Sequence, residues 1–181
     1  MNINTQKKPD IIIVDDHLIF RQGLKAIINF EDVGTVIAEA SNGEDFLEIL
    51  KKLNPDLVLM DIDMPNMNGF EATQKALEIL PDLKIIAFTV FSETEYYTKM
   101  KEIGAKGFIL KSSGFNELEN AIKIVMNGDS YFDNKLKTEN NTELVRKEAL
   151  IALKKECDIL KNKNKMLFFP WVLNQRDCVD R

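Results

Sequence analysis

Short apolar segments alternate with amphipathic segments over the first 128 residues of the chain. The apolar segments are rich in β-branched residues, and two of them contain the unbroken runs IIIV and LVLM. Strands covered on both faces show such continuous runs, whereas a half-exposed strand alternates apolar and polar residues. The pattern therefore predicts five buried strands, at residues 10–14, 35–40, 56–60, 84–89 and 107–110.

The segments between these strands place apolar residues three or four positions apart, which is the spacing of a helix with one buried face. Ser92 followed by Glu95 fits a capping box and predicts a helix start. Gly104 and the pair Asn127-Gly128 predict helix ends. The predicted helices cover residues 17–30, 41–53, 69–80, 92–104 and 115–128.

Strands that alternate with helices predict an α/β fold, here a doubly wound five-stranded parallel sheet with helices on both faces. In an open sheet of this kind the ligand site lies beyond the carboxyl ends of the strands. Four of the five predicted strands end in chemically active side chains, namely Asp15 with Asp16, Asp61, Thr89 and Lys111. We expect these side chains to converge on one edge of the sheet.

This set of side chains suits a metal ion and a phosphoryl group. Three carboxylates repel one another, so one of them stays protonated unless a cation binds. Mg²⁺ prefers a few carboxylate oxygens together with water and phosphate oxygens. A Thr hydroxyl and a Lys ammonium can bind a phosphoryl group, and an Asp beside the metal can act as a nucleophile. Asp61 follows the central strand and is the predicted nucleophile.

The segments IIIVDDH, LVLMDIDMPNMNG, AFT and GFILK resemble the receiver domain of bacterial two-component response regulators. The resemblance covers residues 9–128, and DDHLIFRQGL and TVFSETE are similar to the LuxR/NarL-type subfamily. It implies a flavodoxin-like sheet with strand order 2-1-3-4-5. It also implies a signalling switch rather than an enzyme, with a histidine kinase as partner and control of transcription as output.

The resemblance assigns roles to the acidic residues. Asp61 would accept a phosphoryl group from the histidine kinase. Asp15 and Asp16 would hold Mg²⁺ together with Asp61. The backbone carbonyl of Asp63 would complete the protein ligands of the metal.

It also assigns the residues that bind and report the phosphoryl group. Thr89 and Lys111 would bind the phosphoryl group, and Phe108 falls at the position of the switch aromatic. In the family the Thr moves toward the phosphoryl group while the aromatic turns inward, a two-state change driven by local charge. The chain departs from the family at Ser112, where many receivers have Pro, and at Val90, where many have Ala or Gly.

Other residues near these motifs have simpler interpretations. His17 is the only histidine and follows the acid pair, so we interpret it as a helix-start residue rather than a general base. Met60, Met64 and Met67 are interpreted as packing residues rather than metal ligands.

Two alternative functions stay open at this point. The motif MDIDMP also fits a haloacid-dehalogenase-type phosphatase, in which the first Asp is the nucleophile and the second is the acid/base. Here, however, the motif follows the third predicted strand, and an acid pair already ends the first. The other alternative is a stand-alone receiver that acts through protein contacts without a working DNA-binding domain.

Charge divides the chain into an acidic body and a basic tail. Residues 1–134 carry 13 Lys/Arg and 22 Asp/Glu, a net charge of −9, whereas residues 135–181 carry +4. Two cysteines, Cys157 and Cys178, do not make a disulfide framework. The first ten residues lack the apolar core of a signal peptide. No apolar run approaches the roughly 20 residues of a membrane helix, so we expect a cytoplasmic protein without membrane association.

The sequence predicts a receiver domain at residues 1–128, a linker at 129–141 and a helical tail at 142–181. LKKECDIL at 153–160 is similar to the first helix of the LuxR-type DNA-binding domain. The residues after it fit no turn followed by a recognition helix, so we interpret the tail as a truncated helix-turn-helix domain. We therefore expect weak, salt-sensitive contact with nucleic acid at most. We expect homodimerisation on phosphorylation, with MLFFPWVL at 166–173 as a further candidate dimer contact.

Overall fold

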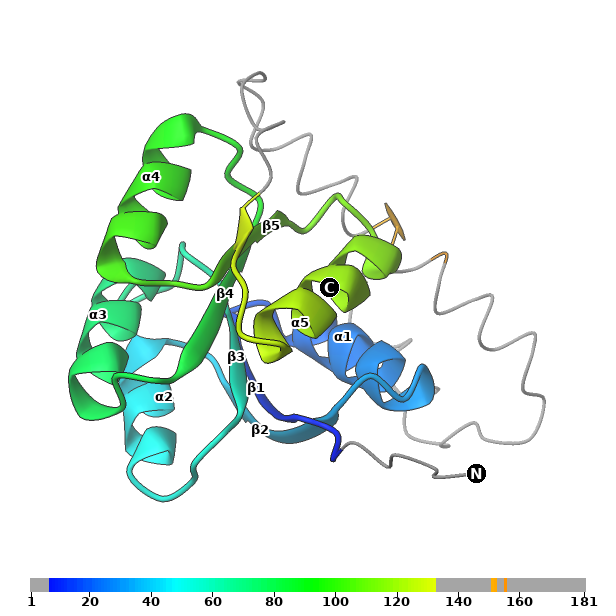
Figure 1. Ribbon diagram of the computed structural model, residues 1–181, viewed down its shortest axis with the longest axis horizontal. Coiled ribbons are helices and arrows are strands. Elements are labelled where there is room, and N and C mark those ends of the chain that lie inside the picture. Colours follow the sequence, from blue (N-terminus) through cyan, green and yellow to red (C-terminus); the bar gives the residue numbers. More distant parts are fainter. Residues whose placement is uncertain (1–6, 133–150, 153–154, 156–181) are drawn as a thin grey trace, which may run out of the picture.

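The computed structural model describes residues 7–132, 151–152 and 155. They form a parallel sheet with strand order β2-β1-β3-β4-β5-β6 (Figure 1). The strands are β1 (Asp10–Val14), β2 (Thr35–Ala40), β3 (Leu57–Met60), β4 (Lys84–Thr89), β5 (Gly107–Leu110) and β6 (Tyr131–Phe132). The helices are α1 (Leu18–Phe30), α2 (Gly43–Leu50), α3 (Gly69–Ile79), α4 (Thr94–Ile103) and α5 (Phe115–Met126). The predicted α/β fold and the order 2-1-3-4-5 of its first five strands are confirmed.

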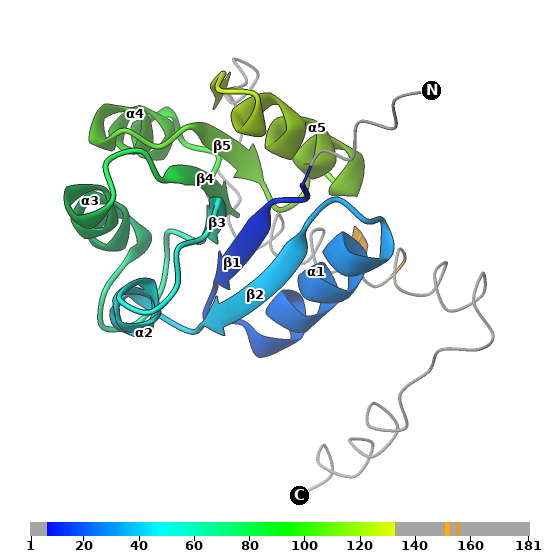
Figure 2. The ribbon, with the colours of Figure 1, turned by 60° about the horizontal axis from the view of Figure 1, so that its bottom comes forward.

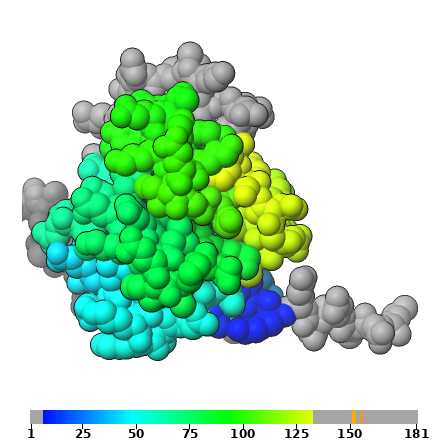
Figure 3. Space-filling view, turned by 60° about the vertical axis from the view of Figure 1, so that its left-hand side comes forward, coloured from blue at the N-terminus to red at the C-terminus, as the bar shows by residue number. Residues whose placement is uncertain are grey.

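The helices form one layer on each face of the sheet. Helices α1 and α5 cover one face, and α2, α3 and α4 cover the other (Figures 1 and 2). Side chains alternate along each strand, so Ile11 and Ile13 pack on the α1/α5 side while Ile12 and Val14 pack on the α2/α3 side. In the space-filling view of the second face, α2, α3 and α4 lie side by side (Figure 3). Burial on both faces explains the continuous apolar runs of β1 and β3.

Strand β6 was not predicted from the sequence. Tyr131 pairs with Gly107 and Phe132 with Phe108, so this short strand extends the sheet beyond β5 in parallel register. Its two residues fall where the sequence predicted the start of the linker. A two-residue strand shows no periodicity, so neither alternation nor an apolar run could reveal it.

The helix ends show where local signals were sufficient. Gly104 has a φ of 109° and ends α4, as predicted. Asn68 caps α3 by accepting a hydrogen bond from the amide of Glu71. The predicted start of α4 at Ser92 is displaced, because Glu93 is the N-cap and the helix begins at Thr94. This shift moves the helix start away from the strand that carries Thr89.

Met60, Met64 and Met67 lie in the apolar cluster between the sheet and the α2/α3 layer, in agreement with the packing interpretation. The linker predicted up to residue 141 and the tail at 142–181 lie outside the described residues, apart from 129–132, 151–152 and 155. Within the part of the chain that the structure describes, no helix is both long and apolar enough to cross a membrane.

Candidate functional site

Three charged side chains meet at the carboxyl edge of the sheet. Asp15 follows β1, Asp61 follows β3 and Lys111 follows β5, and all three are at most 5% exposed. The Nζ atom of Lys111 lies 2.5 Å from Asp61 Oδ2 and 2.6 Å from Asp15 Oδ2. The register of the parallel strands brings these positions to the same edge, as the sequence predicted.

Asp61 is fixed by the loop that follows β3. Its amide donates to the carbonyl of Val14 in the neighbouring strand at 2.8 Å. Its Oδ1 accepts a hydrogen bond from the amide of Ile62 at 2.7 Å. Gly69, the first residue of α3, packs against the backbone of Asp61 so closely that an added Cβ would lie 2.0 Å from the Asp61 carbonyl oxygen. The return of the chain into α3 thus holds Asp61 in place.

Every polar group of Asp15 has a hydrogen-bond or ion-pair partner. Its amide donates to the carbonyl of Ala40 at 3.1 Å, and its Oδ1 accepts from the amide of His17 at 2.9 Å. Its Oδ2 pairs with Lys111, and its carbonyl accepts a hydrogen bond from the guanidinium of Arg21. Its carboxylate therefore has a defined direction toward Asp61 and Lys111.

Charge and burial shift the pKa values of the two buried carboxyl groups in opposite directions. Burial raises the pKa of Asp61 above its ordinary value, and the attraction of Lys111 only partly offsets this while Asp15 adds to it. Burial also acts on Asp15, but the hydrogen bond from His17 and the charge of Lys111 outweigh it and lower its pKa. Burial opposes the charge of Lys111, yet Asp61 and Asp15 together raise its pKa. Asp61 is thus the carboxyl that most needs an added cation.

Asp16 and His17 border the buried group. The Nδ1 of His17 lies 2.7 Å from Asp16 Oδ1 and 3.3 Å from Asp15 Oδ1, and the hydrogen bond with Asp15 raises the His17 pKa. One donor atom from each of Asp15, Asp16, His17 and Asp61 lies within 4.8 Å of the others. Carboxylate oxygens dominate this set, so it fits a small hard cation such as Mg²⁺. The acid pair and Asp61 therefore converge as predicted.

The remaining predicted residues, which differ in their burial and contacts, are Thr89, Phe108, Asp63 and His17. Thr89 ends β4, is fully buried, and its Oγ1 accepts a long 3.4 Å hydrogen bond from the amide of Phe91. Phe108 is 1% exposed and packs against the ring of Tyr97 at 5.7 Å. Asp63 is an exposed residue of the loop after β3. His17 occupies the N-cap position of α1, in agreement with its interpretation as a helix-start residue.

Two supporting residues on α1 were missed by sequence reasoning. The ring of Phe20 lies 4.6 Å from Lys111 Nζ and 5.6 Å from the ring of Phe88. A cation over an aromatic face is attracted by the ring. Arg21 reaches back to the carbonyl of Asp15. Helical spacing placed both side chains on α1 but could not indicate contacts with residues outside it.

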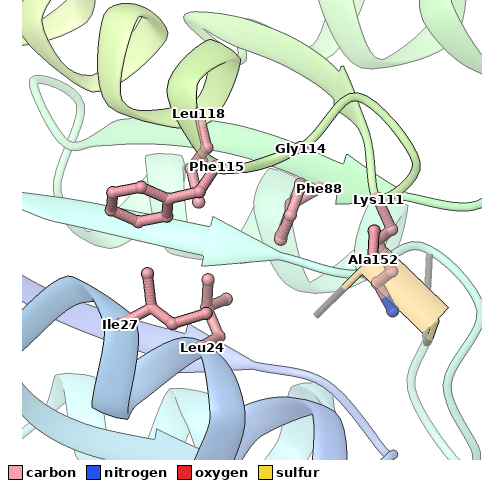
Figure 4. A pocket seen from close by; sticks show the side chains of 8 residues that line it. All are labelled: Leu24, Ile27, Phe88, Lys111, Gly114, Phe115, Leu118 and Ala152. Atoms are coloured by element: carbon pink, nitrogen blue, oxygen red, sulfur yellow. The ribbon is translucent and has the colours of Figure 1, made fainter. Parts of the chain in front are cut away.

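A small pocket lies next to Lys111 between α1 and α5 (Figure 4). Its lining is apolar except for Lys111, so it buries the aliphatic part of that side chain rather than offering a polar ligand site. The lining residues are Leu24, Ile27, Phe88, Lys111, Gly114, Phe115, Leu118 and Ala152.

Comparisons with known proteins agree with this arrangement. Residues 11–123 match the response regulator receiver domain. The chain is 37% identical to the transcriptional regulatory protein DegU of Brevibacillus brevis over 131 residues, which cover 72% of this chain and 56% of DegU. It is 34% identical to the oxygen regulatory protein NreC of Staphylococcus epidermidis over 152 residues, 83% of this chain and 70% of NreC. The chain thus spans little more than half the length of the first of these relatives.

Solved structures give the same result. A two-component response regulator of the LuxR family from Aurantimonas sp. SI85-9A1 superposes with a TM-score of 0.67 at 28% identity, covering 80% of this chain and 97% of that one. A DNA-binding response regulator of the LuxR family from Staphylococcus aureus gives 0.63 at 28% identity, covering 66% and 99%. The chain belongs to the response regulator receiver family and is of the LuxR/NarL type.

Proposed function

We propose that this receiver is a phosphorylation switch in which Asp61 accepts a phosphoryl group from a histidine kinase. The observation that carries the proposal is the contact of Lys111 Nζ with the carboxylates of both Asp61 and Asp15 at the strand ends. A buried nucleophilic carboxylate, a second acid and an ammonium together supply positioning and charge neutralisation. Phosphoryl transfer needs little else from a protein.

In the proposed reaction an Asp61 carboxylate oxygen attacks the phosphorus of a phosphohistidine. The new O–P bond forms as the N–P bond breaks, and the imidazole leaves with its electron pair and takes up a proton. Lys111 stabilises the negative charge on the transferred oxygens. Asp15, Asp16, Asp61 and the backbone carbonyl of Asp63 would hold Mg²⁺, which supplies further charge neutralisation when bound.

Thr89 and Phe108 would convert the modification into a change of shape. The long hydrogen bond from the amide of Phe91 holds the Thr89 hydroxyl weakly, so little is lost when the hydroxyl turns toward a phosphoryl oxygen. Phe108 lies on the neighbouring strand and contacts Tyr97 of α4. Movement of Thr89 would therefore alter the packing of α4 against β5.

Control of transcription is the proposed output. DegU is a transcriptional regulatory protein, and the S. aureus relative is a DNA-binding response regulator. In this chain residues 142–181 would be the effector part, joined to the receiver at 1–128 by the linker. Because the sequence after residue 160 fits no recognition helix, the second candidate is a receiver that acts through protein contacts. Sequence-selective binding of a promoter duplex by the whole chain would favour the first candidate.

Beryllofluoride, which mimics the phosphoryl group on Asp, tests the proposal without a kinase. With Mg²⁺ present, ¹⁹F NMR of the wild-type chain should show a bound fluoride signal, and amide exchange should change in α4 and β5. Asp61→Asn should show neither effect. A bound signal that persists in Asp61→Asn would remove Asp61 from its assigned role.

A further inference from the structure

Arg21 is a buried cation beside the acidic site that the proposed chemistry does not use. It lies in the first turn of α1 and is 9% exposed. Its Nη1 donates a hydrogen bond to the carbonyl oxygen of Asp15, six residues earlier in the chain. The guanidinium therefore links α1 to the backbone that presents the Asp15 carboxylate.

The surroundings of Arg21 fix its orientation. Its Nε lies 3.6 Å from Glu39 Oε2 on β2, and Glu39 Oε1 pairs with Lys25 at 2.8 Å. Within the described residues Nε has no hydrogen-bond partner, whereas Nη1 donates to the Asp15 carbonyl. Burying a guanidinium is costly unless its contacts compensate. Of the contacts named here, the hydrogen bond to the Asp15 carbonyl is the one that joins Arg21 to the acidic site.

Electrostatics alone would make Arg21 unfavourable for a cation site. A positive charge near Asp15 and Asp16 repels a bound divalent ion, and Lys25 in the same network carries the same charge. Any benefit of Arg21 to cation binding must therefore come from geometry. The amide of Asp15 donates to Ala40 and its carbonyl accepts from Arg21, so the peptide groups on both sides of the Asp15 Cα are held by hydrogen bonds.

We propose that Arg21 is a positioning residue that fixes the Asp15 backbone and thereby raises the affinity of the acidic site for divalent cations. The inference rests on the proposed cation site and deepens it. Loss of a group that orients a metal ligand typically lowers metal affinity by about 10- to 100-fold.

The direction in which a substitution changes the Mn²⁺ affinity distinguishes a positioning role of Arg21 from an effect of its charge. Arg21→Met removes the hydrogen bond and one positive charge, and we expect Mn²⁺ to bind at least about tenfold more weakly. Lys25→Met removes one positive charge from the same network but no contact with Asp15, so it should bind Mn²⁺ at least as tightly as wild type. Arg21→Lys keeps a charged donor and should restore most of the affinity.

Free Mn²⁺ measured by electron paramagnetic resonance gives these affinities for the whole chain, with circular dichroism confirming that each variant is folded. Hydrogen exchange of the His17 amide, which donates to Asp15 Oδ1, should accelerate in Arg21→Met and not in Lys25→Met. If Arg21→Met does not fold, Arg21→Gln replaces it, since its shorter side chain cannot span to the Asp15 carbonyl and should bind equally weakly.

The outcomes distinguish the two proposals. Unchanged or tighter Mn²⁺ binding in a folded Arg21→Met or Arg21→Gln would overturn the positioning role and leave Arg21 as a structural link between α1 and β2. Wild-type chain that binds no Mn²⁺, or binds it equally well in Asp61→Asn, would overturn the proposed cation site itself.

Discussion

The contact between Gly69 and Asp61 makes a specific prediction about the substitution Gly69→Ala. An added Cβ would lie 2.0 Å from the Asp61 carbonyl oxygen and 2.8 Å from Ile62 Cα, whereas real Cβ atoms essentially never approach within 3.0 Å. Both partners are backbone atoms and cannot rotate away. The loop after β3 must therefore move by about 1 Å, a strain of the kind that costs about 3 kcal/mol in a packed core.

This strain should appear in both stability and chemistry. About 3 kcal/mol lowers the melting temperature of a domain of this size by roughly 12 °C. The same displacement moves the Asp61 carboxylate, and a misplacement of about 1 Å can cost about 100-fold in rate. We expect phosphorylation by acetyl phosphate to slow by about that factor. Alanine is intrinsically a better helix former than glycine, so a loss of stability at the first position of α3 cannot come from helix propensity.

Gly128→Ala is the matched control, measured by thermal unfolding and by the rate of modification. Gly128 follows the end of α5 with a φ of +98° and has no atom within 4 Å of an added Cβ, so its substitution costs only the left-handed backbone penalty of about 1 kcal/mol. If Gly69→Ala melts within a few degrees of Gly128→Ala and is modified at the wild-type rate, the reasoning about the Asp61 loop is wrong.

Three further predictions concern charge at the site. Mg²⁺ at about 100 times its dissociation constant should stabilise the wild-type chain against thermal unfolding by about 2.7 kcal/mol, and absence of any shift would contradict cation binding. Lys111→Met leaves the buried Asp15 and Asp61 carboxylates without their ammonium partner and should lower the free energy of unfolding in chelator by about 3 kcal/mol. Mg²⁺ should then stabilise this variant by more than it stabilises the wild-type chain. Because burial raises the Asp61 pKa, ionised Asp61 costs stability as pH rises above 3.8, so Asp61→Asn should be the more stable chain in chelator at neutral pH. That advantage should shrink toward pH 3.8 in urea titrations, and an advantage independent of pH would contradict the argument.

The positions of the strands followed from short apolar segments that alternate with amphipathic ones, and the resemblance to receiver domains implied their order. Parallel pairing then places Asp15, Asp61 and Lys111 at one edge without further information. For the same reason the convergence of the site was predictable residue by residue. What the strand ends do not specify is the geometry within the site, such as the double ion pair of Lys111.

The features that were missed depend on contacts between distant residues. In the sequence Arg21 is simply one polar position of an amphipathic helix. Only the folded chain brings its guanidinium to the Asp15 carbonyl. Strand β6 is too short for a pattern and forms because β5 offers a free edge to Tyr131 and Phe132. The start of α4 is a local difference of two residues: Glu93 is the N-cap and makes no side-chain capping hydrogen bond, although Ser92 fitted the capping pattern in the sequence.

Mapping the modified residue shows directly whether Asp61 is the phosphoryl acceptor. The wild-type chain is incubated with acetyl phosphate and Mg²⁺, treated with borohydride to reduce the acyl phosphate to homoserine, and sequenced by tandem mass spectrometry. If Asp61 is the acceptor, we expect homoserine at position 61 in the wild type and no modified residue in Asp61→Asn. Homoserine at Asp15, Asp16 or Asp63 with Asp61 unmodified would contradict it.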